Sequence, residues 1–80
     1  MAILFLHELL PGETGRVLEI HTKGSMRRRF LDLGLIPGTE VKCIGRSPGG
    51  DPTAFQIRGA VVAIRRVDGA SIRVSNGKEG

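Results

Sequence analysis

Short apolar stretches separated by turn residues make up most of the chain. Five of these stretches have the length and composition of β-strands, namely 16–21, 40–45, 53–58, 60–66 and 71–74. In the first, strand periodicity puts Leu18 and Ile20 on one face and Val17 on the other. The stretch 60–66 is the most apolar, so we expect it to be a central strand. The pattern predicts an all-β domain.

Pro-Gly pairs at 11–12 and 37–38 each precede a predicted strand. Proline presets φ at the first central position of a type II turn, and glycine accepts the positive φ of the second. The first pair also ends a helical turn predicted from the leucine spacing in 6–10. Before it, Ile3–Leu6 is either a short strand or the start of the core.

One segment has helical periodicity instead. Met26, Phe30 and Leu33 are spaced at i, i+4 and i+7, which predicts a helix from Met26 to Leu33 with one buried face. Ser25 is the expected N-cap, and Gly34 can adopt the left-handed conformation that closes a helix. A helix of about two turns is not stable alone, so it must pack on the strands.

Together these elements predict a small five-stranded SH3-like barrel, partly open, with one short helical insertion. The alternative is an open antiparallel sheet with a helix across one face. A chain of 80 residues has room for one small core. We therefore expect a single domain over residues 1–75 and a frayed tail over residues 76–80.

The formal net charge of +4 favours an acidic protein surface, nucleic acid or anionic lipid as a partner, although simple solubility explains it equally well. No apolar run approaches the ~20 residues of a membrane span, and no signal peptide is recognisable. The single cysteine excludes an internal disulfide and fits a reducing compartment. We expect a cytoplasmic protein that does not insert into the membrane.

Catalytic and metal-binding patterns are missing from the sequence. The two histidines, His7 and His21, lie in no catalytic motif, so we expect neither enzymatic activity nor a cofactor. Glu19 and His21 share a strand face and could hold a transition metal weakly, but two ligands do not make a closed site. Cys43 falls on an inward face and is expected to act as a small apolar residue. We predict no metal site.

Two polar segments stand out as candidate partner-binding residues. Arg27, Arg28 and Arg29 fall in the first turn of the predicted helix, where the helix dipole disfavours cations. Guanidinium groups there could receive a carboxylate or phosphate, or simply form a solvated face. The second segment is a rigid turn formed by Gly49, Gly50, Asp51 and Pro52, in which a structural role for the aspartate is equally plausible.

Nucleic acid is the alternative partner, because small basic barrels often bind it. Single-strand binders stack bases on aromatic side chains, but this chain has three phenylalanines and no tyrosine or tryptophan. The arginines and lysines outside 27–29 are scattered along the chain. We therefore expect no nucleic-acid binding.

Several motifs in order resemble those of the FeoA family over residues 6–74. They are Leu9-Leu10-Pro11-Gly12 with Gly15 and Val17, Arg28-Arg29-Phe30-Leu31-Asp32-Leu33-Gly34-Leu35-Ile36-Pro37-Gly38, Gly49-Gly50-Asp51-Pro52, and Ile64-Arg65-Arg66 before Ala70 and Ile72. The resemblance implies an SH3-like barrel that accompanies the bacterial ferrous-iron transporter FeoB.

The resemblance implies a cytoplasmic accessory or adaptor protein that contacts the cytoplasmic region of a FeoB-type transporter. The family is also associated with transition-metal binding, so a weak metal-binding regulator is an alternative, alongside the nucleic-acid-binding barrel. Self-association is a further expectation, because exposed barrel edges can pair between copies.

Overall fold

The computed structural model of the chain describes residues 2–76. Its elements in chain order are β1 (Ile3–Phe5), the 3-10 turn η1 (Leu6–Glu8), β2 (Thr14–Ile20), α1 (Gly24–Asp32), β3 (Glu40–Arg46), β4 (Thr53–Ile57), β5 (Ala60–Ile64), α2 (Arg66–Gly69) and β6 (Ile72–Ser75). The backbone N–H of Asn76 donates to the Ala2 carbonyl at 3.0 Å. The rest of the predicted tail, residues 77–80, lies outside the described residues.

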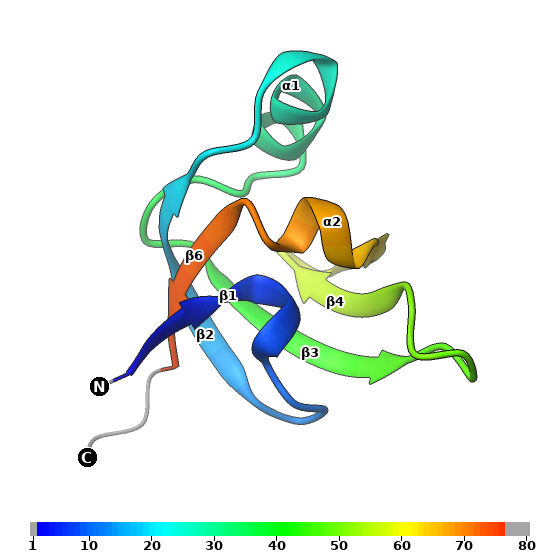
Figure 1. Ribbon diagram of the computed structural model, residues 1–80. Helices are drawn as coiled ribbons and strands as arrows, with labels where there is room; N and C mark the ends of the chain where they lie inside the picture. The colour runs from blue at the N-terminus through cyan, green and yellow to red at the C-terminus, as the bar shows by residue number, and fades with distance from the viewer. Residues whose placement is uncertain (1, 77–80) are drawn as a thin grey trace.

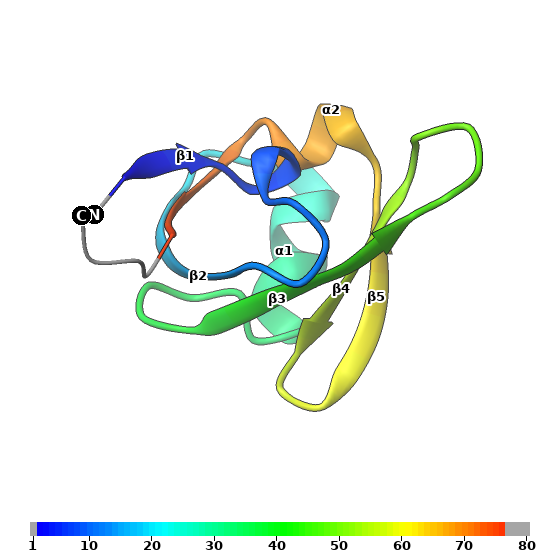
Figure 2. The same ribbon diagram turned by 90° about the horizontal axis from the view of Figure 1, so that it is seen from below.

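The strands form one antiparallel sheet in the order β1-β6-β2-β3-β4-β5. Figures 1 and 2 show this sheet curling around the interior, with α1 standing at one end. The predicted all-β fold with one helical insertion is confirmed. The described residues contain six strands and not five, because Ile3–Phe5 pairs with β6.

Twelve apolar side chains form the core. They are Leu6, Leu9, Val17, Phe30, Leu35, Val41, Cys43, Phe55, Ile57, Ile64, Ile72 and Val74. In β2 the expected faces are wrong. The pairing of β2 with β6 shifts register between Val17 and Glu19, and this bulge lets buried Val17 and half-buried Ile20 both pack against the core.

The most apolar stretch is not central. β5 pairs only with β4, so it is an edge strand, and Val61 is 65% exposed. The tight hairpin at Arg58 and Gly59, whose φ angles are 50° and 83°, pairs β5 with β4 on one side only. After β5 the chain leaves the sheet and forms α2, where the sequence had predicted strand to residue 66 and then a turn. β1 and β5 remain as edges, and pairing between copies stays a prediction.

The predicted helix exists but begins earlier. α1 starts at Gly24, and the residue before it provides no side-chain cap, so Ser25 is not the N-cap. Phe30 is buried, while Met26 and Leu33 are partly buried against the core. The end of the helix is as predicted. Gly34 has φ 96°, and the N–H of Leu35 donates to the Phe30 carbonyl at 3.0 Å, as in a Schellman motif.

Both Pro-Gly turns are also confirmed. Gly12 and Gly38 have φ angles of 90° and 95°. In each turn the N–H that follows the glycine donates to the carbonyl three residues earlier, at 2.9 Å and 3.0 Å. Among residues 2–76, no helix has the length and apolar composition needed to span a membrane.

Candidate functional site

The arginine cluster does not lie where the sequence placed it. Because α1 begins at Gly24, Arg27, Arg28 and Arg29 occupy its middle and last turns. The predicted conflict with the helix dipole is therefore wrong, and Arg29 lies where the dipole favours a cation. All three residues are exposed.

The three arginines are not equivalent. The Nη1 of Arg27 donates to the carbonyl of Ile20 at 2.8 Å and to that of Thr22 at 3.4 Å. These bonds join the helix to the end of β2. The guanidinium of Arg27 is thus used within the chain, whereas no hydrogen bond or ion pair of Arg28 or Arg29 occurs within residues 2–76.

Arg28 and Arg29 border a shallow groove on α1, which we call the helix groove. Its lining residues are Ser25, Met26, Arg28, Arg29, Asp32 and Leu33, and its volume is about 600 Å³. The half-buried Met26 and Leu33 give it an apolar floor. A partner that presents apolar side chains next to an acidic group fits this combination.

Hydrogen bonds within the chain fix the position of the Gly49–Pro52 loop. Both the N–H and the hydroxyl of Ser47 donate to the Pro52 carbonyl at 3.0 Å. The Oδ1 of Asp51 accepts from the N–H of Arg66, the first residue of α2, at 2.9 Å. Asp51 therefore has a structural role, that of tying the loop to a helix fifteen positions away.

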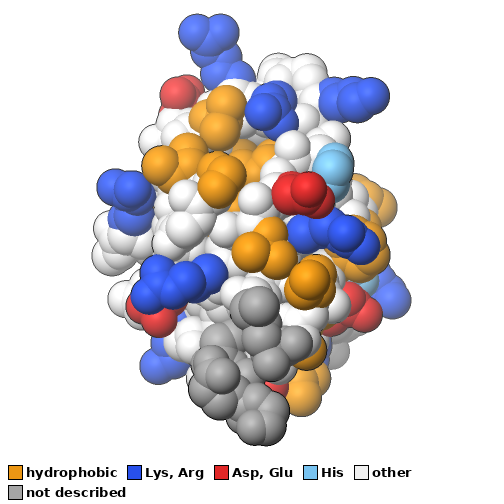
Figure 3. Space-filling view, turned by 90° about the vertical axis from the view of Figure 1, so that its left-hand side faces the viewer, with side chains coloured by type: hydrophobic (Ala, Val, Ile, Leu, Met, Phe, Trp, Pro, Cys, Tyr) orange, Lys and Arg blue, Asp and Glu red, His pale blue; other side chains and the backbone are white. Residues whose placement is uncertain are grey.

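The two predicted partner-binding segments do not meet. Figure 1 places α1 at the top of the molecule and the loop between β3 and β4 at its lower right-hand end. The basic charge does not form one stripe on the face shown in Figure 3 either. On the face shown in Figure 3, lysine and arginine side chains are separated by apolar, acidic and uncharged groups.

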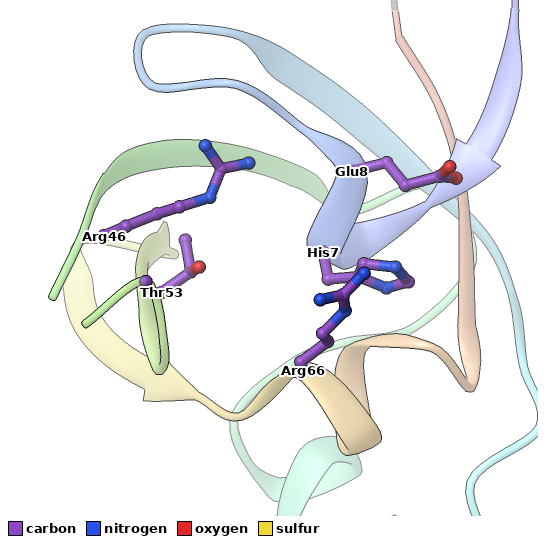
Figure 4. A pocket seen from close by; sticks show the side chains of 6 residues that line it. His7, Glu8, Arg46, Thr53 and Arg66 are labelled. Carbon is purple, nitrogen blue, oxygen red and sulfur yellow. The ribbon is translucent and has the colours of Figure 1, made fainter.

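The structure adds a cavity that the sequence did not predict. It measures about 390 Å³ and lies among η1, the β3–β4 hairpin and α2, with His7, Glu8, Arg46, Gly50, Thr53 and Arg66 as its lining. Figure 4 shows Arg46 and Thr53 on one side and His7 and Arg66 on the other. We call it the arginine cavity. Gly50 is its one member from the predicted set.

The candidate metal ligands pair with each other. The Nε2 of His21 lies 3.0 Å from the Oε1 of Glu19, and both side chains are more than half exposed. Within residues 2–76, no cluster of three or more histidine, cysteine, aspartate or glutamate side chains could hold a metal ion. Cys43 is fully buried as predicted, and burial raises the pKa of its thiol.

These features first define the structural class of the protein. The chain is a small, curled antiparallel β-sheet with α1 at its end, and its surface recesses include the helix groove and the arginine cavity. It is thus a small barrel-like β-domain, an architecture that hosts many unrelated functions. The family model described as "FeoA domain" matches residues 5–76, and the chain belongs to this family.

One curated relative is a fusion protein of Fe(2+) transport protein A and the Fe(2+) transporter FeoB from Porphyromonas gingivalis. It is 30% identical over 69 residues, which are 86% of this chain and 8% of the relative. The chain thus spans less than a tenth of the length of that protein. The family is associated with ferrous iron transport.

Solved structures of family members have the same fold. The FeoA protein of Chlorobium tepidum is 33% identical with a TM-score of 0.88, over 96% of this chain and 75% of that one. The FeoA of Stenotrophomonas maltophilia, described as an SH3 domain protein and solved in complex with zinc, is 26% identical with a TM-score of 0.80, over 90% and 89%. The SH3-like fold is confirmed.

Proposed function

We propose that the chain is a cytoplasmic adaptor that binds the cytoplasmic region of a FeoB-type transporter and supports ferrous iron uptake without holding iron. The proposal rests mainly on the Porphyromonas gingivalis relative, in which Fe(2+) transport protein A and the transporter FeoB form one polypeptide. Fusion keeps a domain at high effective concentration beside its partner, which benefits a pair that must bind each other.

The helix groove is the proposed contact surface on α1, with the Gly49–Pro52 loop as a second contact. The guanidinium groups of Arg28 and Arg29 are exposed and beside an apolar floor. Exposed arginines steer an acidic partner and give specificity, while the apolar contact supplies most of the affinity.

Binding can be measured with a FeoB-type transporter in membrane vesicles of both orientations. We expect saturable binding of the full chain to inside-out vesicles and none to right-side-out ones. Arg28→Gln should weaken it by roughly tenfold, equivalent to about 1.4 kcal/mol. Lys42→Gln, which removes the same charge from an exposed position on β3, is the matched control. Absence of binding to inside-out vesicles would refute the adaptor role.

A weak transition-metal site is the second candidate, favoured by the zinc in the Stenotrophomonas maltophilia structure. Anaerobic calorimetry with ferrous iron and with zinc distinguishes the adaptor from a metal-binding regulator. We expect no stoichiometric site tighter than about micromolar, which corresponds to roughly 8 kcal/mol. The Glu19–His21 pair offers two ligands, fewer than such affinity requires. A tighter site for either metal would favour a metal-binding regulator.

Nucleic acid is excluded from the proposal because the basic side chains are scattered and the aromatic ones are few. A mobility-shift assay with DNA and RNA should show no complex at any salt concentration. Tight binding that falls steeply with added salt would instead support a basic barrel.

A further inference from the structure

The arginine cavity holds cationic groups that have no acidic partner. Residues 2–76 contain two ion pairs, His21–Glu19 and Arg65–Asp68, and neither involves Arg46 or Arg66. The side chain of Arg66 makes no hydrogen bond within the described part of the chain, and that of Arg46 makes one, to the Leu9 carbonyl at 3.2 Å. Both guanidinium groups therefore keep donors for a ligand.

The nearby carboxylates are already used. The Oε1 of Glu8 accepts from the N–H of Phe5 at 2.8 Å, and Figure 4 shows its carboxylate directed away from the cavity. Asp51 is bonded to the backbone of α2. An anion that enters between Arg46 and Arg66 thus meets the guanidinium groups without displacing an internal ion pair.

The wall of the arginine cavity that His7 forms is closely packed and contains a nitrogen without a hydrogen-bond partner among the described residues. The ring of His7 stacks on that of Phe5, with centroids 6.2 Å apart and planes within 7°, and Gly69 of α2 lies directly against its backbone. The Nδ1 of His7 is buried and has no hydrogen-bond partner among the described residues. Such atoms are rare in folded proteins, and a bound ion or water is the usual explanation.

We infer that the arginine cavity binds a phosphate group, either free or carried by a small phosphorylated molecule. Guanidinium groups stand on opposite walls with the Thr53 side chain beside one of them. A single planar carboxylate is satisfied by one guanidinium fork, whereas a phosphate presents oxygens in several directions. A volume of about 390 Å³ also leaves room for the organic part of a small ligand.

The inference does not rest on contact with a transporter. It is tested by titrating the labelled full chain with inorganic phosphate and with adenosine 5′-monophosphate, with sodium chloride keeping the ionic strength constant. Amide resonances of Gly50, Thr53 and Arg66 should shift in a saturable manner. Tighter binding of the nucleotide than of phosphate would identify an organic phosphate as the ligand, and weaker binding of the nucleotide would identify free phosphate. Equal binding would show that the phosphate group alone is recognised.

Arg66→Gln is the decisive variant, because the Arg66 side chain makes no hydrogen bond or ion pair within residues 2–76 and its loss should not disturb folding. It should weaken phosphate binding by about tenfold or more, since bonds between charged groups are the strong ones. Lys42→Gln removes the same charge from an exposed position on β3, outside the cavity, and should bind as the parent does. The inference is wrong if no saturable shift appears up to ~10 mM phosphate, or if Arg66→Gln binds as tightly as the parent.

Discussion

Replacing Arg27 by glutamine is expected to lower the free energy of unfolding by about 1 kcal/mol. The guanidinium donates to the carbonyls of Ile20 and Thr22 at 2.8 Å and 3.4 Å, and glutamine is too short to reach both. A hydrogen bond from a charged donor contributes about 1.5–3 kcal/mol. Because Arg27 is exposed and the second bond is long, we expect a value somewhat below this range, about 1 kcal/mol.

The measurement is a thermal or urea melt of Arg27→Gln beside Arg28→Gln. Both variants lose one positive charge from the same helix, but only Arg27 has bonds to the end of β2. For a domain of this size, 1 kcal/mol corresponds to a fall in Tm of about 4–8 °C. Arg28→Gln should melt within ~1 °C of the parent, since surface substitutions usually change stability little.

The comparison matters for function as well. A loss of transporter binding in Arg27→Gln would be ambiguous, because a loosened α1 distorts the helix groove, whereas the same loss in a stable Arg28→Gln reports on the contact itself. If Arg27→Gln and Arg28→Gln melt at the same temperature, then Arg27 does not hold the helix, and the structural role given to it here is refuted.

Four further changes test the fold. Phe30→Ala should cost ~3–5 kcal/mol in a denaturant melt, because this buried ring anchors α1 to the barrel; an unchanged midpoint would contradict its burial. Gly15→Ala should cost ~1–3 kcal/mol, because the new Cβ would lie 2.6 Å from a carbonyl of β6. Asp51→Ala should cost ~0.5–2 kcal/mol through the lost cap of α2, with Asp51→Asn retaining part of it. Cys43 is buried with a raised pKa, so iodoacetamide should label it only on unfolding; rapid labelling of the folded chain would oppose this.

Local features of the fold were predictable because local chemistry determines them. The Pro-Gly turns and the left-handed Gly34 depend on φ preferences of single residues, which neighbouring segments rarely override. The strand positions follow from apolar periodicity, and β3 and β4 begin where the sequence placed them. The inward position of Cys43 follows from the same alternation.

Strand order was not predictable in this way. An apolar composition indicates that Ala60–Ile64 is a strand but not which strands it pairs with. It lies at the edge because the chain leaves the sheet after it and forms α2. α2 was missed for a related reason. Four residues give no helical periodicity, and the cap that begins this helix comes from Asp51 in a remote loop.

The arginine cavity could not be predicted from the sequence for the same reason. Its walls come from η1, the β3–β4 hairpin and α2, so no sequence window contains the constellation. Neither Arg46 nor Arg66 belongs to the hydrophobic core. The fold of the FeoA domain family brings these three segments together. Phosphate binding depends instead on Arg46, Thr53 and Arg66, which are far apart in the sequence and meet only in the folded chain.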